Sequence, residues 1–108
     1  MQVTLLEAHR IGFGASGRNG GQLGSGQRMD QEGLEGFVGH QEAKKLWQLG
    51  EEAKDLVKSL IAKHDIQCHL RPGVAWTASS SRESKHLHDY GRHLEDRYGY
   101  DQIELLSP

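Results

Sequence analysis

The pattern of apolar and polar residues divides the 108-residue chain into a polar, irregular first part and a second part with helical periodicity. From Gln41 to about His64, apolar side chains recur every three or four residues and charged side chains fill the other faces, which predicts an amphipathic helix. Gly50 lowers the helix propensity by about 1 kcal/mol relative to alanine and allows close contact with a neighbouring segment. The apolar positions are Ala43, Leu46, Trp47, Ala53, Leu56, Val57, Leu60 and Ile61, and Trp47 is expected in the core.

A second helix is predicted to begin after Ser80. Glu83 follows Ser80 at the spacing of a capping box, in which the serine side chain and the glutamate side chain satisfy backbone amides of the first turn. Gly99 is a suitable helix stop because glycine adopts the left-handed conformation without strain. The apolar stripe between these signals consists of Leu87, Tyr90, Gly91, Leu94 and Tyr98.

Other segments have the patterns of short strands. Residues 3–8 form a short apolar, partly β-branched run that reaches the acidic Glu7. Residues 66–70 alternate apolar and polar positions, and a Pro-Gly turn leads from them into residues 74–77, which predicts a hairpin. Ile103, Leu105 and Leu106 predict a last short strand. Two main helices with short strands give an α+β fold class.

Residues 12–26 contain seven glycines in fifteen positions, so this stretch is predicted to bend sharply and to approach a ligand with its backbone amides. Residues 28–39 are predicted to be an irregular link with a short turn of helix around Leu34. Gly12, Gly14 and Gly17 match the dinucleotide fingerprint as a pattern. The residues after Gly17 are poor helix formers, and no second strand ending in an acid follows, so the literal fingerprint is rejected.

The stretch from Val3 to Gln22 resembles the second strand and following flavin loop of the FAD-dependent glycine/D-amino acid oxidase family. Within that family it is most similar to γ-glutamylputrescine oxidase-like amine oxidoreductases. The string Ala-Ser-Gly-Arg-Asn-Gly-Gly at residues 15–21 carries most of this likeness, and residues 41–78 match more weakly. The resemblance implies a fragment of an α/β FAD-binding (Rossmann-type) oxidoreductase. Residues 1–39 would be a partial FAD-binding segment, and residues 40–108 a helix-strand-strand-helix-strand portion that leads into the substrate domain.

In the family, a first strand with the true glycine fingerprint precedes the equivalent of Val3, and a long substrate domain follows the equivalent of Pro108. We therefore expect a fragment or truncated product that neither retains FAD nor oxidises a substrate by itself. The implied reaction of the complete enzyme is oxidation of the carbon–nitrogen bond of a small-molecule amine or amino acid, with hydride transfer to FAD. No catalytic residue is assigned from this chain.

The resemblance also implies cofactor-binding residues. Glu7 matches the acid that accepts hydrogen bonds from the adenosine ribose. Arg18 supplies a fixed positive charge suited to phosphate or to anionic reduced flavin, and glycine amides add donors for an anion. A loop of this composition equally fits a mobile surface segment when no ligand orders it. The residues that match the stretch beside the pyrophosphate and the flavin ring are Ser16, Arg18, Asn19, Gly20, Gly21 and Gln22.

Composition excludes several classes of protein. A net charge of −2 and a pI of about 6.4 argue against nucleic-acid or anionic-membrane binding, and no apolar run is long enough for a membrane span. The single cysteine, Cys68, excludes an internal disulfide and favours a cytoplasmic location. With 35% hydrophobic and 6% aromatic residues the available core is modest, which predicts marginal stability.

The sequence predicts neither a metal site nor a nucleophilic serine. His86, Asp89 and His93 share a face of the second predicted helix, but structural zinc usually needs four close ligands, so a solvated face is preferred and no metal site is predicted. Ser16 lacks the flanking glycine of a nucleophile elbow because Arg18 stands there.

The alternative function is a non-enzymatic fold fragment or interaction module. The predicted strand at residues 3–7 would lack a neighbour and would pair with a second copy or with a chain that supplies the missing flavin-binding parts.

Overall fold

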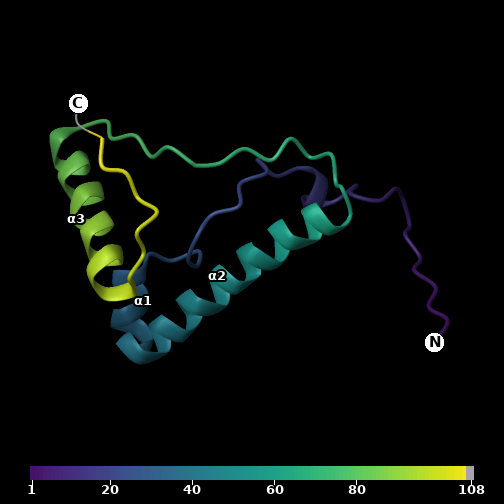
Figure 1. Ribbon diagram of the computed structural model, residues 1–108, viewed down its shortest axis with the longest axis horizontal. Coiled ribbons are helices and arrows are strands. Elements are labelled where there is room, and N and C mark those ends of the chain that lie inside the picture. Colours follow the sequence, from purple (N-terminus) through teal and green to yellow (C-terminus); the bar gives the residue numbers. More distant parts are fainter. Residues whose placement is uncertain (107–108) are drawn as a thin grey trace.

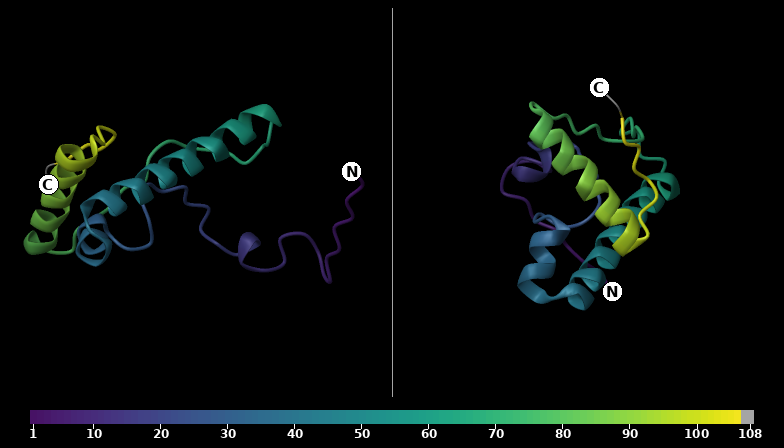
Figure 2. Two further views of the ribbon diagram at one scale, coloured as in Figure 1. Left: turned by 90° about the horizontal axis from the view of Figure 1, so that it is seen from below. Right: turned by 90° about the vertical axis from the view of Figure 1, so that its left-hand side faces the viewer.

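The computed structural model describes residues 1–106, which form three α-helices and one short 3₁₀ turn (Figure 1). The 3₁₀ turn η1 spans Ala15–Gly17, and the helices are α1 (Gln31–Val38), α2 (His40–Lys63) and α3 (Ser81–Tyr98). The helices meet at one end of the molecule, and the N-terminal segment extends away from them (Figure 2). The radius of gyration of 17.5 Å exceeds the roughly 13 Å of a compact chain of this length, so the fold is open.

The predicted α+β class is wrong, because the structure contains no strand among residues 1–106. The segments at residues 3–8, 66–70, 74–77 and 103–106 all lack regular secondary structure. A strand is stabilised by hydrogen bonds to a neighbouring strand, and alternating apolar residues do not supply that neighbour. Val3, Leu5 and Leu6 accordingly remain at least three-quarters exposed.

The predicted helix from Gln41 to about His64 is confirmed as α2. The irregular link before it contains more helix than expected, since the short turn around Leu34 is part of the eight-residue helix α1. Asp30 caps α1 by accepting a hydrogen bond from the Gly33 amide at 2.7 Å. Gly39, with a φ of 82°, lies between α1 and α2 and allows the chain to reverse direction there.

The second predicted helix is confirmed as α3, and its ends have the expected caps. Ser80 Oγ accepts a hydrogen bond from the Glu83 amide at 3.2 Å, and Gly99 adopts the left-handed conformation with a φ of 65°. The glutamate reaches one residue further back than in a capping box, because Glu83 Oε2 accepts hydrogen bonds from both the amide and the hydroxyl of Ser79.

A small core lies where the three helices meet. Leu34 of α1, Ala43 and Trp47 of α2 and Leu94 of α3 are its buried apolar side chains. The ring of Trp47, which the sequence placed in the core, lies 5.4 Å from the Tyr98 ring and 5.2 Å from the Tyr100 ring. The helical end of the molecule is thus packed around one tryptophan. None of the helices in residues 1–106 is long and apolar enough to cross a membrane.

Candidate functional site

The glycine-rich loop is held in shape by the side chain of Asn19. Its Nδ2 donates to the carbonyl oxygens of Ala15 and Ser16 at 3.1 and 3.0 Å, and its Oδ1 accepts from the Gly21 amide at 2.8 Å. Side-chain bonds of this kind replace the backbone bonds that a turn would otherwise need. Asn19 therefore brings Ser16 and Gly21 to either side of one closed turn.

Glycine is required in this loop for two separate reasons. A Cβ atom on Gly17 would lie 2.1 Å from the carbonyl oxygen of Gly12, so any side chain there would collide with backbone. Gly12 and Gly21 have φ values of 76° and 68°, a conformation that L-residues rarely adopt. The sharp bends expected from the sequence are present.

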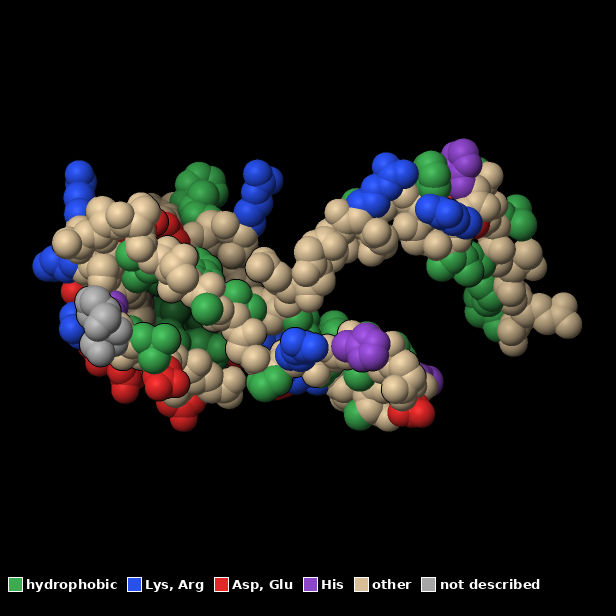
Figure 3. All heavy atoms as spheres, turned by 90° about the horizontal axis from the view of Figure 1, so that it is seen from above, with side chains coloured by type: hydrophobic (Ala, Val, Ile, Leu, Met, Phe, Trp, Pro, Cys, Tyr) green, Lys and Arg blue, Asp and Glu red, His purple; other side chains and the backbone are tan. Residues whose placement is uncertain are grey.

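The positively charged side chains of this segment pack around the ring of Phe13. The guanidinium carbon of Arg18 lies 4.8 Å from the centroid of the Phe13 ring, and that of Arg10 lies 5.9 Å from it. The His9 ring stacks on the same phenylalanine at 4.3 Å. Among the described residues, neither arginine forms an ion pair with a carboxylate, so both charges are available to an anion. Figure 3 shows basic and histidine side chains on this segment, which projects from the rest of the molecule.

The other expected cofactor residues lie on the surface. Glu7 Oε1 accepts a hydrogen bond from the amide of His9 at 3.0 Å, so the carboxylate contacts its own segment and not Arg18. Gly20 and Gln22 are exposed, and a Cβ on Gly20 would meet open space. The structure therefore joins Ser16, Asn19 and Gly21 through hydrogen bonds and leaves the remaining expected residues facing solvent, and the cofactor role of the whole set stays a prediction.

The C-terminal end of the loop lies against α2. A Cβ on Gly50 would stand 3.1 Å from the Gly26 carbonyl oxygen, so the absence of a side chain lets the loop reach the helix. Gln27 Nε2 donates to the Leu46 carbonyl at 2.8 Å beside this contact. The close approach expected of Gly50 is confirmed.

A buried lysine ties the same end of the loop to two other segments. Lys54 Nζ donates to Ser25 Oγ at 2.7 Å and to Glu51 Oε2 at 2.6 Å. The Ser25 and Tyr100 hydroxyls are 2.8 Å apart, and the ammonium lies 5.1 Å from the centre of the Tyr100 ring. Burial disfavours the charged lysine, but the hydrogen bond and charge of Glu51, together with Tyr100, outweigh it and raise the pKa of Lys54. Lys54 is therefore a cation at neutral pH.

An open, mainly apolar groove of about 390 Å³ runs between the end of the loop and α2. Its floor is the helix surface, and the loop forms one wall. The lining residues are Leu23, Gly24, Gly26, Gln27, Leu49, Gly50, Ala53, Lys54 and Val57.

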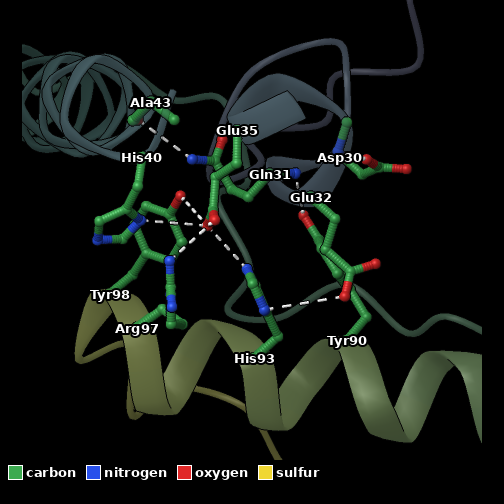
Figure 4. Close-up of polar contacts among 11 residues, drawn as sticks. Asp30, Gln31, Glu32, Glu35, His40, Ala43, Tyr90, His93, Arg97 and Tyr98 are labelled. Atoms are coloured by element: carbon green, nitrogen blue, oxygen red, sulfur yellow. Dashed lines mark hydrogen bonds and ion pairs between the residues drawn. The ribbon is translucent and has the colours of Figure 1, made fainter. Parts of the chain in front are cut away.

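A second polar cluster joins α1 to α3 around the carboxylate of Glu35 (Figure 4). Glu35 Oε1 accepts from the Tyr98 hydroxyl at 2.6 Å and lies 2.9 Å from His93 Nε2, while Oε2 accepts from Arg97 Nη2 at 3.1 Å. His40 Nδ1 approaches to 3.4 Å. Partial burial raises the pKa of Glu35, but the Tyr98, His93 and His40 contacts and the Arg97 charge outweigh it and lower that pKa to about 2.

The Glu35 cluster was not predicted from the sequence. The partners of Glu35 on α3 are 58 to 63 residues away, so no local pattern could connect them to it. The one available signal was the spacing of His93 and Arg97, which are four residues apart and therefore lie on one face of α3. This spacing indicates that one face of α3 contacts an acidic residue, but it does not identify that residue.

Two of the three residues rejected as metal ligands, Asp89 and His93, have other partners. His93 contacts Glu35, and Asp89 pairs with Lys85 and Arg92 on the surface of α3. Within residues 1–106 the structure gathers no three histidine, cysteine, aspartate or glutamate side chains that could hold a metal ion.

A glycine-bent loop with exposed arginines, tied to a helical body by its far end, defines a segment suited to an anionic ligand. The chain belongs to the family of FAD-dependent oxidoreductases: the sequence profile of the DAO family, described as FAD dependent oxidoreductase, matches residues 1–108. This confirms the family resemblance of the sequence, and FAD is the cofactor of the family.

Curated relatives support the same family. The chain is 38% identical over 105 residues to γ-glutamylputrescine oxidoreductase of Escherichia coli strain K12 and 39% identical over 111 residues to the probable oxidoreductase OrdL of Rhizobium meliloti strain 1021. It is 36% identical over 107 residues to the probable oxidoreductase OrdL of Haemophilus influenzae. These alignments cover 96–97% of the chain and 24% of each relative, so the chain spans about a quarter of their length. No solved structure matches the chain.

Proposed function

We propose that the chain is the flavin-contacting segment of an FAD-dependent oxidoreductase that oxidises the carbon–nitrogen bond of an amine or amino acid. The observation that carries the proposal is the loop from Ser16 to Gln22, which Asn19 holds closed and in which Arg18 makes no ion pair with a carboxylate of the described residues. The similarity to a γ-glutamylputrescine oxidoreductase supports an amine as the substrate class.

The residues present fit the diphosphate of FAD. The amides of Gly14, Ala15 and Gly20 take no part in the hydrogen bonds of residues 1–106, so they remain available as donors. Together with the charge of Arg18, they form the kind of donor set that binds phosphate. The second carboxylate oxygen of Glu7 is likewise open to a ribose hydroxyl.

In this proposal the chain binds and orients its cofactor. FAD, when bound, supplies the redox chemistry by accepting a hydride from the substrate carbon. Arg18 offsets negative charge next to the loop, and the glycine backbone allows close approach. The proposed division is a flavin segment at residues 1–39 and a portion leading to the substrate domain at residues 40–108. The isolated chain is proposed to be inactive and to lose FAD during purification, because a few exposed donors bind a nucleotide weakly.

A segment exchange tests this function. The 105 matched residues of the E. coli relative are replaced by this chain, and flavin content and γ-glutamylputrescine oxidation are measured. We expect a yellow, active protein that loses flavin when Arg18→Ala is introduced. Arg71→Ala is the matched control, because Arg71 is exposed and lies outside the loop. A chimera that folds, as judged by circular dichroism, but holds no flavin would count against the proposal.

A second candidate function is association with another chain, either a second copy or a complementing polypeptide. Leu49, Leu56, Val57 and Leu60 recur along one side of α2 and are 40–58% exposed, which leaves an apolar stripe uncovered. Light scattering after size-exclusion chromatography tests it. We expect a dimer or larger assembly that Leu56→Glu disrupts, whereas a wild-type monomer over a wide concentration range would exclude self-association.

A further inference from the structure

We infer that Lys54 is a positioning residue, which fixes the end of the glycine-rich loop on α2 so that residues 16–22 leave the helical body at a defined place. This inference rests on the proposed flavin role of that loop and extends it to a residue about thirty positions away in the sequence. Lys54 bonds Ser25 and Glu51 and not residues 16–22, so it acts on residues 16–22 through Ser25.

The Lys54 side chain is buried and hydrogen-bonded. A lysine side chain that is only 7% exposed needs hydrogen-bond partners, and Lys54 has two at 2.6 and 2.7 Å, Glu51 on its own helix and Ser25 on the loop. The bond from a charged donor to Ser25 is stronger than a bond between neutral groups. The loop is thus held at a point three residues after Gln22.

Several contacts converge on the short segment at residues 25–27. Ser25 also bonds the Tyr100 hydroxyl, Gly26 approaches Gly50 closely, and Gln27 bonds the Leu46 carbonyl. By contrast, residues 1–22 are all exposed. The boundary between the anchored and the exposed part of the loop therefore falls just after the proposed flavin contacts. The position of the anchored residues 25–27 therefore sets where the exposed residues 16–22 leave the helical body.

The backbone of the loop also contacts the core next to Ser25. A Cβ atom added to Gly26 would lie 3.0 Å from the Trp47 ring, so the backbone at Gly26 already contacts the core. Glycine contacts stabilise little by burial, since they lack apolar side-chain area. The bond from Lys54 to Ser25 is a charge-assisted contact between the loop and α2, whereas the bond from Gln27 to the Leu46 carbonyl joins neutral groups.

The experiment measures loop docking in the full 108-residue chain by NMR. Wild-type protein is expected to show contacts between the Gly26 α-protons and the Trp47 ring, and slow amide exchange at residues 25–27. Lys54→Met is expected to weaken these contacts and to accelerate exchange there by about tenfold or more, as loss of a charged hydrogen bond implies. Ser25→Ala should reproduce the effect while leaving the Lys54–Glu51 pair in place.

Lys58→Met is the matched control, because Lys58 is exposed on the same helix and its nearest carboxylate oxygen, on Asp55, is 4.0 Å away. Lys54→Arg keeps a positively charged donor and should therefore retain more of the docking than Lys54→Met does. A purely space-filling role of Lys54 would not predict this difference. Unchanged docking in Lys54→Met, or equal loss in Lys58→Met, would overturn the inference.

Titration with FAD separates the inference from the function on which it rests. If the loop is positioned for flavin, Lys54→Met should weaken the FAD-induced shifts at residues 16–22 by a similar factor. Undocking with unchanged FAD shifts would overturn the positioning role while leaving the flavin proposal standing. A wild-type chain without any FAD response would count against the proposed function, and the docking measurement would still decide whether Lys54 fixes the loop.

Discussion

The carboxylate of Glu35 accepts a hydrogen bond from the Tyr98 hydroxyl, with 2.6 Å between the two oxygen atoms, and so joins α1 to the end of α3. The two residues are 63 positions apart in the sequence. His93 and Arg97, from the same helix as Tyr98, complete the contact. In a chain with a small core, this polar junction is a main tie between α1 and α3.

The Glu35 junction predicts a specific loss of stability in acid. Because folding lowers the pKa of Glu35 from its ordinary 4.5 to about 2, its contribution is fully present above pH 4.5 and is lost as the pH falls from 4.5 toward 2. At pH 7 we expect Glu35→Gln to lower the free energy of unfolding by about 1–3 kcal/mol. Urea unfolding at pH 7, 4.5 and 3 measures this, and the difference between wild type and variant should shrink with decreasing pH.

Glu42→Gln is the control for this measurement, since Glu42 is an exposed partner of Lys45 on α2. It should change stability by less than about 1 kcal/mol at every pH. Ser79 and Lys85 also lower the pKa values of Glu83 and Asp89, respectively. Both residues are unchanged in Glu35→Gln, so their contributions cancel in the stability difference between wild type and variant. A difference between wild type and Glu35→Gln that stays constant with pH would contradict the assignment.

Gly50→Ala tests the close contact between the loop and α2. In an exposed helix this change would stabilise by about 1 kcal/mol, but here the new Cβ would stand 3.1 Å from the Gly26 carbonyl oxygen. We expect Gly50→Ala to be less stable than Gly36→Ala, in which the Cβ meets open space on α1. Thermal unfolding of both variants decides the question, and equal stabilisation would show that the loop does not press on Gly50.

Ser80→Ala tests the cap of α3. Loss of the bond to the Glu83 amide is expected to cost about 1 kcal/mol of stability. Ser81→Ala, at the first helical residue, is the neighbouring control and should change stability by less than about 0.5 kcal/mol. If chemical denaturation gave the same midpoint for both variants, the cap would not contribute as the structure indicates.

The sequence predicted those parts of the fold that local signals determine. The three- and four-residue apolar spacing predicted α2, and Ser80 with Gly99 marked the ends of α3. For α1, Gly33 and Gly36 weakened the helical pattern, although Asp30 is a residue type favoured as a helix cap. These signals act within one or two turns, so no distant contact is needed to interpret them.

The strands and the polar clusters could not be predicted in the same way. Residues 66–70 alternate as a strand does, but a strand also needs a neighbour, and the described chain provides none. The Lys54 and Glu35 clusters combine residues from three segments each, so their existence depends on how the helices pack. In the candidate site, the glycine content of the sequence predicted the bends of the loop and the close contact at Gly50. It did not predict that Arg18 packs over the ring of Phe13.

We propose that residues 16–22, together with Glu7, contact FAD. The most direct test of this proposal is a titration of the ¹⁵N-labelled chain with FAD at millimolar concentration, which detects weak binding. We expect shift changes centred on Arg18, Asn19, Gly20 and Gly21, which are smaller in Arg18→Ala and unchanged in Arg71→Ala. Shift changes confined to α2 and α3, or none at all, would contradict it.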